Sequence, residues 1–277
     1  MSSTSYSPPP AQPPAAPQHP APRPGWITPL VAVVGGLALL VTVTGATVTG
    51  IRALGSGDHR LTVSVEGIDT LDVDVSSGSF TLEYGRVSDA VLDVDGSNGW
   101  ELRRSGSTLE VRPPVLWFGW WFGGSDRVVL TLPESTLSAG WDARFDLSAG
   151  DLRVDGEFDS LELGVSAGEA TVTGSASDVR GKVSAGTVYL TLADVVRAEL
   201  DVSAGRMDAG FSGSAPESVG LDVSAGELNL VVPEGVYDVR SDVSAGSFDN
   251  DLDTASASPL KITVDVSAGS ASARSAR

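Results

Sequence analysis

The sequence contains no cysteine and only two histidines, His19 and His59. Without cysteine the chain can form neither a disulfide framework nor a thiolate site. Both histidines precede the internal repeats of the C-terminal half, which excludes a histidine metal site or a Ser-His-Asp triad within those repeats. The sequence also has no glycine-rich phosphate loop and no metal-ligand spacing. We therefore expect a protein that is not an enzyme and that uses no cofactor and no small-molecule substrate.

Positive charge is scarce as well. The chain has 18 Lys+Arg against 36 Asp+Glu, a formal net charge of -18. Residues 1–57 contain two arginines and no acidic residue, so all the acidic residues lie in the remainder. Such a surface repels phosphate backbones, and we expect no nucleic-acid partner. We interpret the acidity as a solvating surface that opposes aggregation.

Three segments precede the repeats and differ in composition. Residues 1–25 are rich in proline and lack apolar periodicity, which predicts a disordered tail with polyproline II character. Residues 26–51 are uncharged and contain an apolar run that matches the ~20 residues of a membrane-spanning helix. Residues 52–60 are expected to be a linker. A cleaved signal peptide or a buried soluble helix is the alternative for 26–51, but the long, weakly charged leader and the Pro-rich flank fit neither.

Charge does not settle the orientation of the predicted membrane helix. Arg23 lies on its N-terminal side, and Arg52 and Arg60 lie on its C-terminal side, so the positive-inside count is nearly balanced. We expect a single-pass protein of the cell membrane with the tail inside and the C-terminal domain extracytoplasmic.

Residues 61–277 have a different pattern. Apolar residues alternate from Leu61 onward, which indicates half-buried strands. A phrase close to Val-Ser-Ala-Gly then recurs, with glycines at positions 150, 168, 186, 205, 226, 246 and 269. A period of about 20 residues predicts stacked parallel rungs, so the expected fold is an all-β parallel β-solenoid with about three short strands per circuit. An up-and-down barrel would need two-residue hairpin turns, which the repeats lack.

Each residue of the repeated phrase has an expected structural role. Val and Ala should point inward, Gly should take a positive-φ bend, and Ser and the preceding Asp should face solvent. Asp201, Asp222, Asp242 and Asp265 should then align on four successive rungs, where like charges oppose stacking. A bound cation would relieve this repulsion. The calcium-binding β-roll motif is absent, however. We therefore interpret these acids as residues that keep the sheet surface soluble and prevent its edges from pairing with other chains, and we expect no bound metal.

An aromatic cluster lies between two strand-like runs. It consists of Trp117, Phe118, Trp120, Trp121 and Phe122. Tryptophan in an exposed loop favours contact with lipid headgroups or with a partner. Large aromatic side chains are also mostly buried, and the ends of repeat stacks need capping. The cluster is therefore either a contact loop or a plug over one end of the stack, and it is the candidate functional site.

The Val-Ser-Ala-Gly units, the alternating N-terminal region and the segment Val-Val-Leu-Thr-Leu-Pro133 resemble the bacterial putative-adhesin domain family over about residues 61–270. The resemblance implies a β-solenoid domain on a bacterial membrane or surface protein, and it supplies no catalytic residues. The Pro-rich tail and single membrane helix are similar to actinobacterial members, which supports an inside tail.

We consider three functions. The first is a membrane-anchored, non-enzymatic extracytoplasmic domain that acts as an adhesin or in cell-envelope interactions. The second is an accessory of a cell-envelope stress regulator or sensor that acts through a membrane partner. The third, a polysaccharide-cleaving β-helix, would need a positioned acid and base, and the basic residues of the repeats are few and scattered. We expect the first.

Overall fold

A computed structural model describes residues 58–96, 99–113 and 126–276, all within the second of two units, Ala46–Arg277. The described part is all-β, apart from one short 3-10 turn, η1 (Glu134–Thr136). Within it, no helix is long and apolar enough to cross a membrane. The predicted tail, the predicted membrane helix and the aromatic cluster lie outside the described residues.

Strands form where apolar and polar residues alternate. In β12 (Arg197–Val202), Ala198, Leu200 and Val202 are buried, whereas the residues between them are exposed or half-buried. Successive side chains of a strand point to opposite faces, so each strand has one apolar face and one wet face. The prediction of half-buried strands is confirmed.

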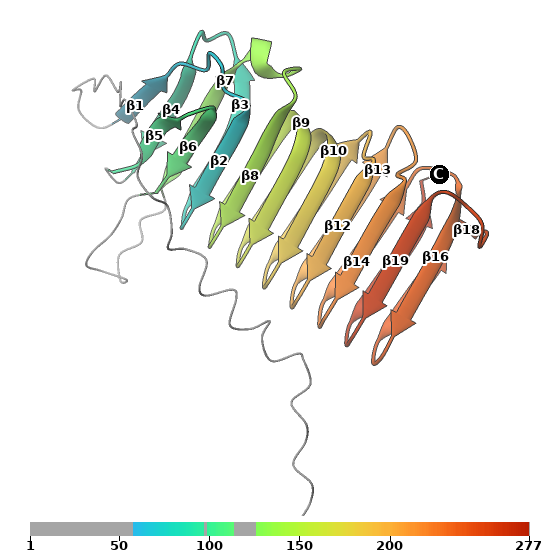
Figure 1. Cartoon of the computed structure of the whole chain (residues 1–277). Helices are drawn as coiled ribbons and strands as arrows, with labels where there is room; N and C mark the ends of the chain where they lie inside the picture. Colours follow the sequence, from blue (N-terminus) through green and yellow to red (C-terminus); the bar gives the residue numbers. More distant parts are fainter. Residues whose placement is uncertain (1–57, 97–98, 114–125, 277) are drawn as a thin grey trace, which may run out of the picture. The chain divides into compact units, whose positions relative to one another are not determined.

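Most strands pair in parallel and form two ladders (Figure 1). The first ladder contains, in spatial order, β6 (Thr108–Arg112), β2 (Thr70–Val75), β8 (Trp141–Leu147), the second half of β9 (Asp151–Val165), the second half of β10 (Glu169–Val183), β12, β14 (Ser218–Val223), β19 (Lys261–Val266) and β16 (Val236–Val243). The second ladder contains β7 (Arg127–Pro133), β3 (Ser79–Gly85), the first halves of β9 and β10, β11 (Thr187–Ala193), β13 (Arg206–Ser212), β15 (Glu227–Val232), β20 (Ser270–Ser275) and β17 (Ser247–Asp251).

A strand of the first ladder, the corner that follows it and the next strand of the second ladder together make one unit, which we call a rung. Strands β12 and β13 form one such rung. The prediction of about three strands per circuit is wrong, because each repeat supplies only two. The apolar alternation continues where we expected bends, so β9 and β10 each run from the second ladder into the first without a break.

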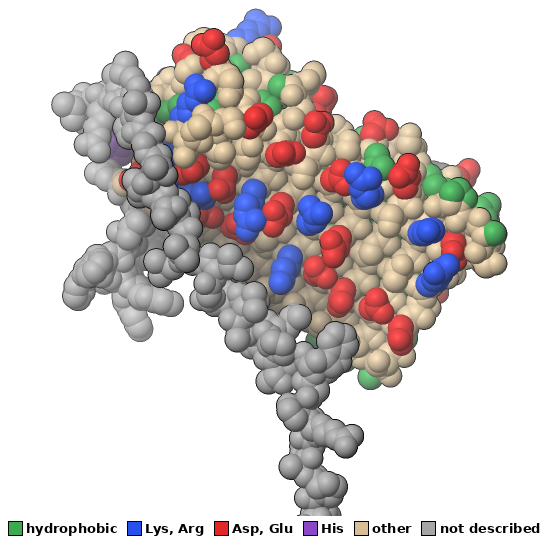
Figure 2. Space-filling model, viewed as in Figure 1, with side chains coloured by type: hydrophobic (Ala, Val, Ile, Leu, Met, Phe, Trp, Pro, Cys, Tyr) green, Lys and Arg blue, Asp and Glu red, His purple; other side chains and the backbone are tan. Residues whose placement is uncertain are grey.

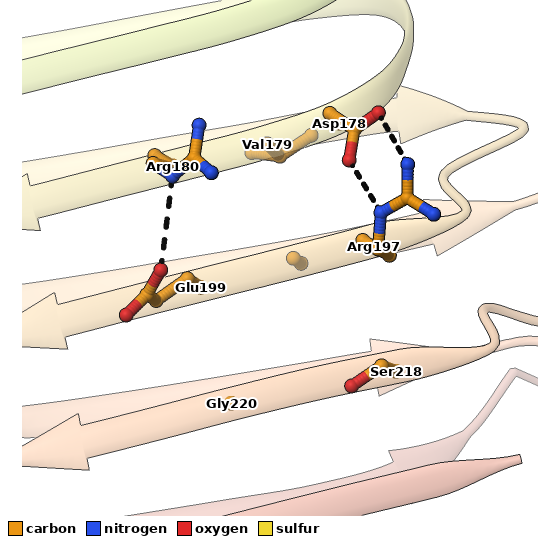
Figure 3. A pocket seen from close by; sticks show the side chains of 8 residues that line it. Asp178, Val179, Arg180, Arg197, Glu199, Ser218 and Gly220 are labelled. Atoms are coloured by element: carbon orange, nitrogen blue, oxygen red, sulfur yellow. Dashed lines mark hydrogen bonds and ion pairs between the residues drawn. The ribbon is translucent and has the colours of Figure 1, made fainter.

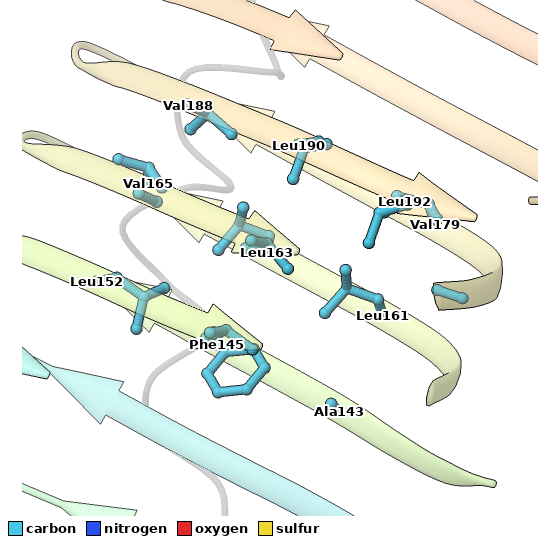
Figure 4. Packing of buried hydrophobic residues seen from close by; sticks show 14 of the residues in the cluster. Ala143, Phe145, Leu152, Leu161, Leu163, Val165, Val179, Val188, Leu190 and Leu192 are labelled. Atoms are coloured by element: carbon cyan, nitrogen blue, oxygen red, sulfur yellow. The ribbon is translucent and has the colours of Figure 1, made fainter. Parts of the chain in front are cut away.

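The apolar faces of the two ladders form one continuous core (Figure 4). Leu161 and Leu163 from the first ladder and Leu190 and Leu192 from the second belong to it, and each is at most 2% exposed. An aromatic pair on neighbouring strands contributes as well, since the rings of Phe145 and Phe158 meet edge to face.

At the corners, the prediction for alanine is wrong. Val202 is buried as expected, but Ala204 is exposed, and the corner alanines of the other repeats are exposed too. Hydrogen bonding explains the difference. The backbone N–H of Ala204 donates to the carbonyl of Ser184 on the neighbouring rung, so the ladder continues through the corner and the bend turns the Ser and Ala side chains outward.

Glycine closes each corner because stacked backbones approach closely there. A Cβ atom on Gly205 would lie 2.5 Å from the carbonyl oxygen of Gly186, and one on Gly226 would lie 2.6 Å from that of Gly205. Gly150 and Gly168 have positive φ values, whereas Gly205 and Gly226 do not. The predicted positive-φ bend is therefore confirmed at only some corners, and lack of space for a Cβ is the shared reason for glycine.

The rungs at the C-terminal end do not follow the order of the sequence. Strand β19 pairs with β14 on one side and with β16 on the other, and β20 lies in the same way between β15 and β17. Figure 1 shows β19 between β14 and β16. The last rung of the described sequence, β19–β20, is thus inserted between the rungs β14–β15 and β16–β17, both of which precede it in the sequence.

Side-chain polarity explains this inserted order. Ser241 of β16 and Asn250 of β17 occupy inward positions, in register with the buried Val264 and Ala273. Both polar residues are exposed, and Asn250 accepts a hydrogen bond from the backbone N–H of Leu252. In sequence order they would be buried between two rungs, at a cost of about 1–3 kcal/mol each. Rung β16–β17 is therefore suited to the end of the stack.

Antiparallel strands cover the other end. Strand β5 (Glu101–Ser105) pairs with β6, β4 (Ala90–Asp95) pairs with β7, and β1 (Asp58–Val63) pairs with β4. Strand β1 begins at Asp58, within the stretch predicted as a linker. The terminal rung β6–β7 is consequently shielded by strands of its own chain, in contrast to the rung β16–β17.

Candidate functional site

The aromatic cluster at 117–122, the predicted site, lies outside the described residues. The strands that flank it are described. Strand β6 precedes it and pairs in register with β2, while β7 follows it and pairs with β3. In the sequence, residues 113–126 stand between β6 and β7, where the corresponding strands of other rungs are separated by Ser-Ala-Gly or a close variant.

A buried aspartate fixes the C-terminal side of this link. The carboxylate of Asp126 accepts a hydrogen bond from the indole N–H of Trp100 at 3.0 Å, and Asp126 is only 7% exposed. Its backbone packs against Gly78, where a Cβ atom would collide with the carbonyl oxygen of Asp126. Asp126, which directly follows the predicted contact segment in the sequence, is therefore held at a defined place at the start of β7.

The outer face of the first ladder carries most of the ordered ion pairs. Arg112 binds Asp72 at 2.5 Å and Asp74 at 2.6 Å. Arg144 binds Asp146 at 2.8 Å and Glu162 at 2.7 Å, the latter on the neighbouring strand. Half-exposed ion pairs of this kind contribute little to stability individually, about 0–1 kcal/mol. They do neutralise this part of the face.

Charge alternates along one column of the same face. Arg144, Glu162, Arg180 and Glu199 follow one another in register. The next two positions are Gly220 and Thr263, which carry no charge. The alternation therefore stops where the ladder passes from β12 to β14.

The neighbouring column is acidic where the alternation stops. Asp201, Asp222, Asp265 and Asp242 lie side by side in this spatial order, and we call them the aspartate column. The predicted alignment of these four residues is confirmed, but the predicted order of the last two is wrong because β19 is inserted. Lys182 adjoins the column only at Asp201. Figure 2 shows acidic side chains gathered over these strands.

Proton affinity reflects this crowding. Burial, together with the charge of Asp222, raises the pKa of Asp201. Burial and the charge of Asp265 raise the pKa of Asp222. The ionised forms of Asp201 and Asp222 are thus disfavoured, and a cationic group placed against them would be attracted.

A depression of about 270 Å³ lies beside the aspartate column (Figure 3). On its rim Arg197 makes a two-point contact with Asp178, and Arg180 faces Glu199 at 3.7 Å. Ser218 and Gly220 on β14 also line it, and their small size leaves space there. Both arginines are already paired with acids, so the depression does not form an anion site. It lies where the alternation of charge along the column stops.

A second depression of about 620 Å³ lies along the edge of the second ladder, at the C-terminal ends of β3 and β11 and the middle of β9 and β10. Tyr84, Asp155 and Glu157 line it, and burial together with these two acids raises the pKa of Tyr84 to about 12. The phenol therefore stays protonated at neutral pH and cannot act as a base. Among the described residues, no group of three or more acidic or histidine side chains lies close enough to hold a metal ion.

The gap in charge compensation could not be predicted from the sequence. It depends on Gly220 lying opposite Thr263, next to the pair Asp222 and Asp265, and only the strand register reveals this pairing. The break in alternation at Ser241 and Asn250 was a readable signal for an end rung. With these positions known, the face can offer an ordered acidic surface for contact.

Comparison with known proteins found no matching family model and no matching curated protein. Three solved structures resemble the chain at low identity. A "putative adhesin" from Bacteroides fragilis has a TM-score of 0.43 at 9% identity, covering 80% of this chain and 98% of its own. A "putative lipid binding protein" from Parabacteroides distasonis has a TM-score of 0.39 at 12% identity, covering 80% and 98%. A "putative cell adhesion protein" from Clostridium sporogenes has a TM-score of 0.31 at 10% identity, covering 79% and 99%. Such scores carry no argument about function, and membership of the putative-adhesin family stays a prediction.

Proposed function

We propose that the protein is a membrane-anchored, non-enzymatic extracytoplasmic domain whose stacked rungs form a β-solenoid and whose first ladder contacts cell-envelope material. The observation that carries the proposal is the register of this ladder. Equivalent strand positions repeat from β2 to β16 at the strand spacing of about 4.8 Å, and four consecutive positions of one column are aspartates. An extended, repetitive ligand can contact such a face at many equivalent points and gain avidity.

The distribution of charge supports the same proposal. The arginines near β2 and β8 are paired with acids, as are those around the depression on β10 and β12. Within the described residues, the positions two residues before Asp222 and Asp265 on the same strands, which belong to the adjacent column, are the uncharged Gly220 and Thr263. The aspartate column therefore favours ligands that carry cationic groups.

Binding to isolated cell-envelope fragments tests this proposal. The full-length protein in lipid nanodiscs should be retained, and replacing Asp222 and Asp265 by Asn should weaken retention several-fold. The matched control replaces Asp151 and Glu169, which form an in-register acidic pair on the second ladder, by Asn and Gln. Equal retention of the two variants would contradict a role for the aspartate column.

We infer that residues 26–51 anchor this domain and that it lies outside the cytoplasm. The uncharged apolar run supports the anchor. Because the chain has no cysteine, a single Ser203→Cys variant can be labelled selectively at an exposed corner. A membrane-impermeant thiol reagent should label it on intact cells. Labelling only after lysis would reverse the orientation.

The alternative is an accessory role in a stress-sensing system, and one observation favours it. Strands β6 and β7, which flank the aromatic segment in the sequence, lie at the end of the stack that also carries β1, the first strand after the predicted anchor. A photo-crosslinking residue at Trp120 should then capture one defined membrane protein, whereas the same residue at the exposed Tyr189 should not. Capture of lipid alone, or of nothing, would contradict this alternative.

A further inference from the structure

The position occupied by β19 and β20 is a slot whose two walls come earlier in the chain. One wall is the rung β14–β15 and the other is the rung β16–β17. The rung β19–β20 thus pairs on both sides with strands that precede it in the sequence. We call this position the strand slot.

Pairing in the strand slot depends on the sequence of the insert and not on its connection to the walls. Val264 lies opposite Leu221 on one side and Ser241 on the other, and Asp265 lies between Asp222 and Asp242. These contacts form through strand register alone. An identical rung from another molecule would make every one of them.

The link that leads into the strand slot crosses the exposed end of the stack. After β17, the short strand β18 (Asp253–Thr254) pairs with the start of β16. The hydroxyl of Ser258 then donates a hydrogen bond to the carbonyl of Val236 at 2.6 Å. These are the contacts that would change if the link passed to a second molecule, while the core of the stack would not.

We propose that the strand slot is a homotypic interaction site, in which two copies of the chain exchange their β19–β20 rungs. Each copy then fills the slot of the other, and the pair has two-fold symmetry. Such exchange conserves the native contacts of the swapped element, which makes it a low-cost route to a dimer. This proposal does not depend on the proposed envelope ligand.

The link is long enough for exchange. Residues 252–260 connect the buried Leu252 to the start of β19, and nine extended residues span at most about 30 Å. The insert must pass one outer rung of its acceptor, a step of about 5 Å, plus the gap between the two facing ends. The reach exceeds this distance.

Concentration and charge decide when exchange occurs. A short flexible link holds its own rung at an effective concentration of about millimolar, so the dilute protein closes on itself. The facing end rungs are acidic, with Asp238, Asp242, Asp249, Asp251 and Asp253 against Arg240. Their repulsion opposes dimerisation and is screened by salt. Crowding on a membrane and raised ionic strength therefore favour exchange.

Disulfide trapping in the full-length, cysteine-free chain tests the proposal. The variants Asp222→Cys and Asp265→Cys are mixed unfolded, refolded together in detergent at high protein concentration, and oxidised. Neighbouring parallel strands place their Cα atoms within the 4.4–6.8 Å range that suits a disulfide. We expect covalent heterodimers, several-fold more than when the two variants are folded separately and then mixed. Equal yields would show surface collision and overturn the proposal.

Two further variants make the result specific. In Asp222→Cys refolded with Asp242→Cys, neither cysteine lies on the exchanged rung, so exchange does not bring the two thiols onto neighbouring strands, and the heterodimer yield should stay at the collision background. Deleting residues 254–257 shortens the link and hinders closure within one molecule, so the heterodimer yield should rise. An unchanged yield after this deletion, or a yield for Asp242→Cys equal to that for Asp265→Cys, would contradict exchange through the strand slot.

Discussion

Asp222 and Asp265 lie directly opposite each other on β14 and β19, although β15 to β18 separate them in the sequence. Gly220 and Thr263 stand two residues before them on the same strands, so neither strand places an opposite charge at that position. The pair thus combines an unusual chain order with an unbalanced charge, and both properties can be tested.

Replacing Asp222 by Asn should stabilise the protein at neutral pH. The pKa of Asp222 is raised in the folded state by burial and by Asp265, so the folded protein holds this proton more tightly than the unfolded chain. Stability is therefore greatest below the ordinary aspartate pKa of about 3.9 and falls as the pH rises through the raised folded value. Chemical denaturation at pH 7 should show a gain of up to about 1 kcal/mol, lost near pH 3.

Asp146 provides the control for that experiment, because it binds Arg144 at 2.8 Å. Asp146→Asn should leave the free energy of unfolding unchanged or lower it by less than about 1 kcal/mol. High salt should reduce both effects. A stabilisation by Asp146→Asn equal to that by Asp222→Asn would mean that overall net charge, and not the column, determines the result.

Replacing a corner glycine by a residue with a side chain should destabilise the protein, because there is no space for a Cβ atom. Gly205→Ala places a Cβ atom 2.5 Å from the carbonyl oxygen of Gly186 and 2.9 Å from Val183 Cγ1, at a φ that is not positive. We expect a loss of about 1–3 kcal/mol in the free energy of unfolding, measured by urea denaturation.

Gly106 allows the effect of backbone conformation to be measured without the effect of crowding. Its φ is +65° and nothing lies within 4 Å of the position that a Cβ atom would take, so only backbone strain opposes a side chain there. Gly106→Asn should be tolerated, since Asn adopts left-handed conformations readily. Gly205→Asn should be as damaging as Gly205→Ala. Similar costs at the two sites would refute the crowding argument.

Making the end rung apolar should cause association. Ser241→Val with Asn250→Leu removes the two inward polar groups of rung β16–β17, next to the already exposed Val243. An apolar open end with unpaired strand edges is a template for other chains. Light scattering should show dimers or larger species that form without unfolding. The outward-facing change Thr263→Val is the control and should leave the mass unchanged.

Loss of the Trp100 donor should destabilise the terminal rung. Trp100→Phe keeps an aromatic ring but removes the indole N–H that binds the buried Asp126. The expected cost is about 1–3 kcal/mol. Arg103→Ala breaks a half-exposed contact with Glu110 on the same end of the stack and should cost less than about 1 kcal/mol. Equal costs measured by thermal denaturation would argue against a structural role for the buried bond.

Alternation and period allowed much of the architecture to be predicted. Leu200 and Val202 are buried and Asp201 lines up with Asp222, as the repeated phrase implied. The inward role of Ala204 could not be predicted correctly, because alternation applies to a strand and the backbone bends there. The alternation of apolar and polar residues does not show at which residue the strand ends and the corner begins.

The order of the rungs was harder to predict for a physical reason. Asp222, Asp242 and Asp265 begin the same five-residue phrase, so each can pair in register with either of the others. Only the polar residues at Ser241 and Asn250 distinguish the end rung from the inserted one. The candidate contact surface shares this dependence, since the gap beside the aspartate column appears only after the rungs are placed in order.

The inserted rung also bears on how the domain would respond to force. A pull applied near Ser275 would load β20 and then β19, each of which is hydrogen-bonded to a strand on both sides. Such strands must slide past two neighbours at once, whereas a strand at the end of a stack peels away one bond at a time. Tension applied at this end is therefore resisted in shear, by the hydrogen bonds that join rung β19–β20 to the rungs on both of its sides.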